Sequence, residues 1–359
     1  MDLLGEASSE SRILSARHIG ADKTLPDTND AINTTILCHT YSLQPDFQTY
    51  LAGLQPFAWV VWSYGLLALL TACVLYVVSI RSALRNWKEH ISHVAVILAV
   101  YPIVTASGFI TLLVPRSRLI AEAVAQQAVM VAMYHMYCLI IAECNGTERL
   151  VRRAEGSRLE TRVLPCCCWP CCVIPKPLLS KKIFTWLKYL ILQMPVIQAI
   201  LYVILLVLFA EDVGLYLIGF SYVQPFIVIS IMFGVWGMIM SVRAAESAGT
   251  RPRKRFLALQ LALIIVKLQY ALGKVLPEML DLPCILALHP TVFVHMLQNI
   301  IMMFEMLLLS TWACCLYSKS PEKVTTNTPQ VVIAVLEDMP TLDDRTIAGV
   351  ENRSFENRI

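Results

Sequence analysis

Seven stretches of this chain are apolar and long enough to cross the hydrocarbon core of a membrane, which takes about 20 residues as an α-helix. They lie at residues 58–80, 91–113, 119–141, 183–209, 215–241, 256–276 and 291–317. The chain as a whole is 57% hydrophobic and 15% charged, whereas about 25% of the residues of a soluble domain are charged. The sequence therefore predicts an all-α membrane protein with seven transmembrane helices.

The basic residues of the connecting loops predict the side of the membrane on which each loop lies, because cytoplasmic loops carry an excess of Lys and Arg. Sixteen basic residues lie in the loops after the first, third and fifth stretches, whereas the opposite loops hold Arg116 and Arg118. We therefore expect an extracellular amino terminus and a cytoplasmic carboxyl terminus. The transmembrane domain at 58–317 then separates an extracellular tail (1–57) from a flexible cytoplasmic tail (318–359).

The expected extracellular segments contain a glycosylation signal and two cysteines. Asn33 begins the sequence Asn-Thr-Thr, which is an acceptor for N-linked glycans on the outside of the cell. Cys38 in the amino-terminal tail and Cys284 between the last two helices share the same oxidising side. A disulfide between them is permitted there, and whether it forms stays open.

Five cysteines lie close together in the expected cytoplasmic loop at 143–182, in the sequence PCCCWPCC. They are Cys166, Cys167, Cys168, Cys171 and Cys172. A reducing cytosol argues against disulfides, and three contiguous cysteines without a nearby histidine do not match the spacing of a zinc site. Cysteines near a membrane and among basic residues are typical S-palmitoylation sites. We therefore favour lipidation, with an unmodified interfacial loop as the alternative.

Polar residues inside the apolar stretches are candidates for a function, because an ionisable group within a membrane normally has a partner or a wet cavity. Gln260 and Lys267 are seven residues apart in the sixth stretch and share one helix face. The polar residues of the seventh stretch, His295, Gln298, Asn299 and Glu305, occupy one part of its circumference. We expect an ion pair between Lys267 and Glu305, because both lie near mid-depth.

Two interpretations of these polar residues stay open. They line a route or pocket for a solute between the sixth and seventh helices, or they form a buried network that fixes helix packing. Glu122 and Gln126, four residues apart in the third stretch, carry a weaker form of the same signal.

The chain lacks the motifs of several kinds of catalytic or nucleotide-driven protein. It has no phosphate-binding loop, no His-Glu-x-x-His zinc motif, no Gly-x-Ser-x-Gly nucleophile motif and no dinucleotide fingerprint. We therefore expect neither an enzyme nor an ATP-driven pump, and no cofactor or metal. The net charge of +3 is too small to imply a nucleic-acid partner.

Several segments together resemble the alpha subunit of the organic solute transporter family. They are PRSRLIAE at 115–122, Glu143 at the end of the third helix, PCCCWPCC at 165–172, RFLALQ at 255–260 with LQ at 268–269, and HMLQNIIMMFE at 295–305. The resemblance runs from about residue 55 to residue 317. The chain differs from the family in Trp169, which interrupts the cysteine run, in a longer amino-terminal tail and in the intramembrane Lys267.

The resemblance implies a transporter in the plasma membrane, with an endosomal membrane as a second location. It implies facilitated, gradient-driven movement of amphipathic organic anions such as bile acids, steroid conjugates and related lipids. Vertebrate members work with a single-span beta subunit, so such a subunit or a homo-oligomer, in the lipid bilayer, are the partners to consider. The alternatives are a seven-helix receptor, and a protein that organises membrane lipids or trafficking without moving a solute.

Overall fold

The computed structural model describes residues 47–55, 57–154, 159, 177–279 and 290–319. The glycosylation signal at Asn33, the two cysteines expected outside the cell and the five-cysteine block all lie outside the described residues. Nothing in the structure therefore tests the glycan, the disulfide or the lipidation.

Within the described ranges, seven helices are long and apolar enough to span a membrane. They are α4 (Ala58–Asn86), α5 (Ile91–Leu113), α6 (Arg118–Glu143), α9 (Lys181–Glu211), α10 (Val213–Ser247), α11 (Arg253–Met279) and α12 (Pro290–Tyr317). Each predicted stretch lies inside one of them, and most helices extend a few residues beyond it into more polar sequence. This confirms the prediction of a seven-helix membrane protein.

Short elements complete the described part of the fold. The helix α3 (Phe47–Leu54) precedes α4, and α7 (Thr147–Arg153) follows α6. The 3-10 turns η2 (Lys88–His90) and η3 (Pro115–Ser117) begin the second and third spans. Asn145 and Gly146 separate α6 from α7, and their φ angles of 57° and 97° belong to the left-handed region that ends a helix and redirects the chain.

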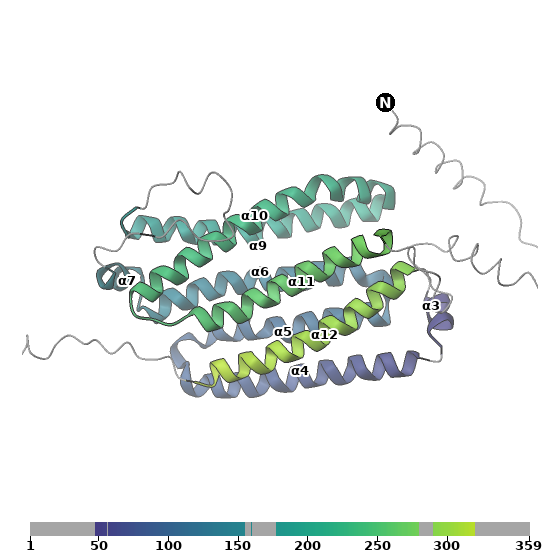
Figure 1. The fold of residues 1–359 in the computed structure, drawn as a ribbon, viewed down its shortest axis with the longest axis horizontal. Helices are drawn as coiled ribbons and strands as arrows, with labels where there is room; N and C mark the ends of the chain where they lie inside the picture. The colour runs from purple at the N-terminus through teal and green to yellow at the C-terminus, as the bar shows by residue number, and fades with distance from the viewer. Residues whose placement is uncertain (1–46, 56, 155–158, 160–176, 280–289, 320–359) are drawn as a thin grey trace, which may run out of the picture.

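The long helices lie side by side along one direction, with α9 and α10 at one edge of the bundle and α4 at the other (Figure 1). Successive helices run in opposite directions, so α3 lies at one end of the bundle and α7 at the opposite end (Figure 1). Pro102, Pro195 and Pro225 lie inside α5, α9 and α10, where neighbouring groups in a membrane bundle can satisfy the backbone groups that proline frees.

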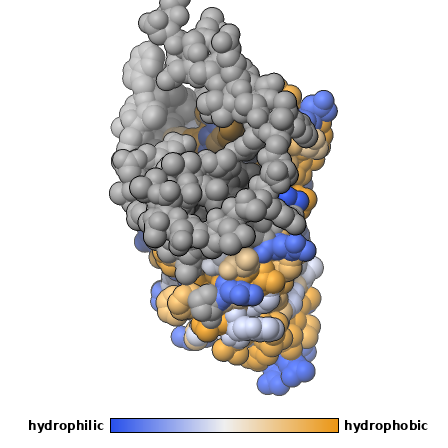
Figure 2. Space-filling view, turned by 90° about the vertical axis from the view of Figure 1, so that its right-hand side faces the viewer, coloured by the Kyte–Doolittle hydropathy of each residue, from blue (hydrophilic) through white to orange (hydrophobic). Residues whose placement is uncertain are grey.

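The core of the bundle is built around α6. Met130, Met133, Met136 and Leu139 on this helix are fully buried. On the periphery of the bundle large side chains are exposed instead: Trp59 of α4 and Tyr222 of α10 are 80% and 73% exposed. Apolar side chains make up much of the coloured surface at the end of the bundle that carries α3 (Figure 2). Such exposed apolar side chains suit a lipid environment rather than water.

Candidate functional site

A network of polar side chains lies inside the bundle where α6, α9 and α11 meet. Lys267 of α11 donates hydrogen bonds through Nζ to Oε1 of Gln126 on α6 and to Oε1 of Gln198 on α9, the latter over 3.3 Å. Gln198 also donates through Nε2 to Gln126 Oε1, over 3.3 Å. The two glutamines are 3% and 2% exposed, so the ammonium group is held among buried amide oxygens.

The network continues from Gln126 to a buried carboxylate. Gln126 donates through Nε2 to Oε1 of Glu122, one turn earlier on α6, over 2.9 Å. The hydroxyl of Tyr202 on α9 donates to the same oxygen over 3.4 Å, and Glu122 is only 4% exposed. We call these five residues the polar network: Glu122, Gln126, Gln198, Tyr202 and Lys267.

The polar network combines groups that are costly to bury alone. A charged side chain near the middle of a bilayer costs about 2.5–3.5 kcal/mol on insertion scales. Here the cation and the carboxylate are each hydrogen-bonded, and Gln126 connects them. Buried polar groups that are fully hydrogen-bonded stabilise one arrangement of helices. The same groups can also bind the polar part of a solute, when that part takes the place of one of their hydrogen-bond partners.

The two residues of the expected ion pair, Lys267 and Glu305, each form hydrogen bonds with other residues. Glu305 of α12 accepts a hydrogen bond from Nε2 of Gln269 on α11. Residues 267 and 269 are about 200° apart around a helix, so Lys267 faces α6 and α9 while Gln269 faces α12. The sequence identified both ionisable residues, and the ion pair between them stays a prediction.

The remaining polar residues of α12 form a second group against α11. His295 Nδ1 and Gln298 Oε1 are 3.1 Å apart, and Asn299 donates through Nδ2 to the His295 carbonyl over 2.8 Å. Gly273 of α11 lies against this group, because a Cβ atom there would overlap Gln298 Oε1. His295 and Gln298 therefore lie against α11, whereas Asn299 also lies beside Gly108 of α5.

Gln260, the last of the predicted polar residues on α11, joins neither group. Its Oε1 atom is buried and accepts no hydrogen bond in the described part of the chain. The same holds for Oε1 of Gln269. Unpaired buried acceptors are costly, and they mark places on α11 where the hydroxyl of a solute or a water molecule gains a hydrogen bond.

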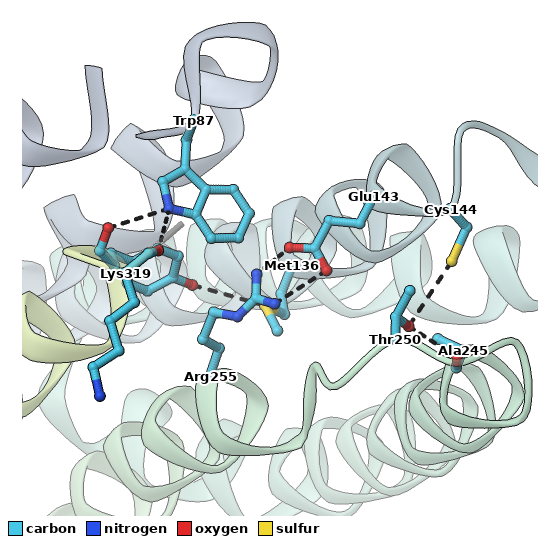
Figure 3. Close-up of polar contacts among 9 residues, drawn as sticks. Trp87, Met136, Glu143, Cys144, Ala245, Thr250, Arg255 and Lys319 are labelled. Atoms are coloured by element: carbon cyan, nitrogen blue, oxygen red, sulfur yellow. Dashed lines mark hydrogen bonds and ion pairs between the residues drawn. The ribbon is translucent and has the colours of Figure 1, made fainter. Parts of the chain in front are cut away.

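A third group, which the sequence did not reveal, joins four helices at the end of the bundle opposite α3 (Figure 3). Arg255 of α11 donates to both carboxylate oxygens of Glu143, the last residue of α6, with the Nη2–Oε2 distance at 3.1 Å. The guanidinium lies 4.6 Å from the ring centroid of Trp87, directly after α4. The Arg255 and Glu143 side chains are 11% and 6% exposed, so this is a buried ion pair.

Trp87 extends this group to α12. Its indole Nε1 donates to the backbone carbonyls of Tyr317 and Lys319, over 3.1 and 3.2 Å, and its ring packs on that of Tyr317 with centroids 5.9 Å apart. We call Trp87, Glu143, Arg255 and Tyr317 the end cluster. The sequence singled out Glu143 and, within RFLALQ at 255–260, Arg255, but it did not predict their contact, because the two residues are far apart in the chain.

Cys144 and Thr250 lie beside the end cluster. The Cys144 Sγ atom is 4.0 Å from Thr250 Oγ1, and Thr250 Oγ1 donates to the Ala245 carbonyl over 2.8 Å (Figure 3). Burial raises the pKa of the Cys144 thiol above its usual value. Across the described ranges, no group of three or more His, Cys, Asp or Glu side chains is placed to hold a metal ion.

Comparison with known proteins identifies the family. The family model described as Organic solute transporter Ostalpha matches residues 61–322, a range that contains the polar network and the end cluster. The Organic solute transporter alpha-like protein of Drosophila melanogaster is 28% identical over 218 residues, which cover 59% of this chain and 65% of that relative. No solved structure matches the chain. The match confirms the resemblance seen in the sequence, and the chain belongs to the organic solute transporter Ostalpha family of multi-pass membrane proteins.

Proposed function

We propose that this chain carries amphipathic organic solutes across the plasma membrane, down the gradient of the solute. The observation that carries the proposal is the polar network, in which Lys267 lies among buried amide groups inside an apolar bundle. Membership of a family described as organic solute transporters supports the same function. Bile acids, steroid conjugates and related lipids are the proposed solutes.

The chemistry of the polar network favours solutes with one anionic group. The Lys267 ammonium supplies a positive charge, and the Gln126 and Gln198 side chains supply amide groups that can reorient. A carboxylate or sulfate that replaces the amide oxygens around Lys267 forms charge-assisted hydrogen bonds, which are stronger than those to a neutral amide. The apolar body of the solute would then lie against the surrounding helices.

The proposed orientation places the amino terminus outside the cell and the carboxyl terminus in the cytoplasm. The end of the bundle with α7 and the end cluster then faces the cytoplasm, where the excess of Lys and Arg is expected. The end with α3 faces outward. In this orientation a solute on the outer side meets Glu122 of the polar network first, because Glu122 lies one turn from the start of α6.

Reconstitution of the purified chain into proteoliposomes tests this function. We expect uptake of a radiolabelled steroid sulfate, measured with and without a co-reconstituted single-span partner. Lys267→Met should lower the initial rate about tenfold, because a charge-assisted hydrogen bond contributes about 1.5–3 kcal/mol and 1.4 kcal/mol is a factor of ten. The control is Lys188→Met, which removes an exposed lysine of α9.

Each arm of this experiment has an outcome that contradicts one part of the proposal. An absence of solute uptake by the unaltered chain under both partner conditions would overturn the carrier function. Full uptake by Lys267→Met would retain the carrier function but remove the polar network as its site. An equal loss in the Lys188→Met control would mean that total charge, rather than the position of Lys267, sets the rate.

A further inference from the structure

The helix α7 turns three arginines away from the bundle. Its Leu150 is fully buried, and Ala154, which follows the helix, is 2% exposed. Residues four apart lie on the same side of a helix, so these two fix the inner side of α7. The rest of its circumference carries Arg149, Arg152 and Arg153, all of them exposed. The turn at Asn145 and Gly146 sets the orientation of α7 directly after α6.

The first residues of α9 add two cations to the same surface. Lys181 and Lys182 are exposed, and Lys181 Nζ lies 2.9 Å from Glu148 Oε1 of α7, which joins the two helices. The hydrogen bond and the charge of Lys181 lower the pKa of Glu148 below its usual value, so Glu148 is ionised and offsets one cation. We call Arg149, Arg152, Arg153, Lys181 and Lys182 the basic surface.

Aromatic side chains adjoin the basic surface on the side toward the membrane core. Trp186 and Tyr189 of α9 are 48% and 64% exposed, and they lie about one to two turns beyond Lys182 along the helix. Trp186 is held edge-on against Trp236 of α10, with ring centroids 6.0 Å apart. Tryptophan and tyrosine are enriched at the level of lipid headgroups, so the basic surface lies at the height of the phosphates.

We propose that the basic surface is a binding site for an anionic phospholipid with a polyphosphorylated headgroup, of the phosphoinositide class. The five cations would contact the headgroup phosphates, and the acyl chains would lie beside Trp186 and Tyr189. Clusters of four to eight Lys and Arg directly beside a transmembrane helix on its cytoplasmic side are typical of such recognition. Along α9 the cations come first and the aromatic side chains follow about one to two turns later, and this order fits a lipid, with its charged headgroup and apolar chains, better than a soluble anion. The site rests on the proposed orientation of the chain and is otherwise independent of the proposed transport.

Native mass spectrometry of the purified full-length chain with dioctanoyl phosphatidylinositol 4,5-bisphosphate tests the site. We expect the unaltered chain to retain the lipid and the triple variant Arg149→Gln, Arg152→Gln, Arg153→Gln to bind it about tenfold more weakly or worse. The matched control is Arg81→Gln, Arg85→Gln, Lys88→Gln, three exposed cations at the same end of the bundle. This control should change binding by less than about twofold, because it leaves the basic surface intact.

A second variant tests the local charge in the opposite direction. Glu148→Gln removes the acid that offsets Lys181, so it should strengthen binding of the lipid about twofold to fivefold. Equal losses in the two triple variants would overturn the proposal in favour of a diffuse charge effect. Retention of free inositol trisphosphate as tightly as the lipid, or no retention of the lipid by the unaltered chain, would overturn it as well.

Discussion

Lys267 of α11 and Glu122 of α6 are connected through one side chain, that of Gln126, which accepts a hydrogen bond from the lysine and donates one to the carboxylate. This fixes the direction of the amide, because its oxygen faces the cation and its nitrogen faces the anion. Opposite charges linked in this way offset part of the cost of placing each of them in an apolar bundle. Under the proposed function, the stability of the bundle and the binding of a solute depend on the same three residues.

Gln126→Leu should destabilise the protein and reduce its transport together. The change leaves Lys267 and Glu122 without their shared partner, which costs about 1–3 kcal/mol for a buried polar group. The midpoint of thermal unfolding in detergent and the rate of steroid sulfate uptake are the measurements. Gln260→Leu is the control for the unfolding measurement alone, because Gln260 Oε1 accepts no hydrogen bond from any described residue. An equal effect of the two changes would contradict the role of Gln126.

A double-mutant cycle should couple Lys267 to Glu122 and not to Glu305. Lys267→Met and Glu122→Gln each leave one charge uncompensated, whereas the double variant removes both charges. We expect a coupling of about 0.5–3 kcal/mol in the free energy of unfolding for this pair. The pair Lys267→Met and Glu305→Gln should be additive within about 0.5 kcal/mol, because Glu305 accepts a hydrogen bond from Gln269 and Lys267 donates to Gln126 and Gln198. The reverse order of the two couplings would restore the ion pair expected from the sequence.

The positions of the helices could be predicted from the sequence, whereas the partners of the polar residues could not. Residues 91–113 were predicted as one span, and α5 has these same limits. Hydrocarbon thickness fixes the length of such a segment, and backbone hydrogen bonding leaves the helix as its only structure. Both constraints act on one segment at a time, so each span can be predicted from its own residues.

Contacts between helices depend on how each helix is rotated about its axis and on which helices pack side by side. Neither hydrocarbon thickness nor backbone hydrogen bonding determines these. Lys267 and Gln269 differ by two positions in sequence, yet one contacts α6 and α9 and the other contacts α12. The end cluster illustrates the same limit, since Trp87 and Arg255 come from spans far apart in the chain. Periodicity identified the polar side of α11 but not the helices around it.

Arg255→Lys should destabilise the protein although it keeps the charge. Lysine cannot reproduce the two hydrogen bonds to Glu143, and its ammonium group does not stack on Trp87 as a planar guanidinium does. We expect a loss of about 1–3 kcal/mol in the free energy of unfolding. The double change Arg255→Met, Glu143→Met should cost less than Arg255→Met alone, because it leaves no buried charge unpaired. A larger loss in the double variant would contradict this account.

Gly273→Ala should destabilise the contact between α11 and α12. Alanine is favoured over glycine inside a helix by about 1 kcal/mol, so an exposed position would gain stability. At Gly273 the added Cβ would overlap Gln298 Oε1 and lie 2.9 Å from the His295 ring. It would therefore disturb the contact between these two side chains, and we expect this loss to reverse the sign. Gly108→Ala on α5 is the milder comparison, because its closest contact is Met303 Cγ at 3.2 Å. Thermal unfolding of both variants measures the difference, and a stabilised Gly273→Ala would contradict the close contact.

Cys144 should report on the integrity of the end cluster through its reactivity. Its thiol is buried and its pKa is raised by burial, so it holds less of the reactive thiolate at pH 7 than an exposed cysteine. Because the pKa of the Cys144 thiol is higher in the folded state than in the unfolded state, the neutral thiol contributes stability below the unfolded pKa. That contribution is lost as the pH rises through the folded pKa. Alkylation of Cys144 by a maleimide should therefore be slower at pH 7 than that of an exposed cysteine and should accelerate as the pH rises.

Peptide-resolved mass spectrometry measures this alkylation without removing the other cysteines. Cys315, which is exposed at the end of α12, serves as the internal reference in the same sample. Arg255→Gln should raise the rate at Cys144 and leave the rate at Cys315 unchanged, because Cys144 directly follows Glu143, the partner of Arg255. An equal acceleration at both cysteines would indicate global unfolding. A slow rate at Cys144 that Arg255→Gln does not change would show that Cys144 is protected independently of the ion pair.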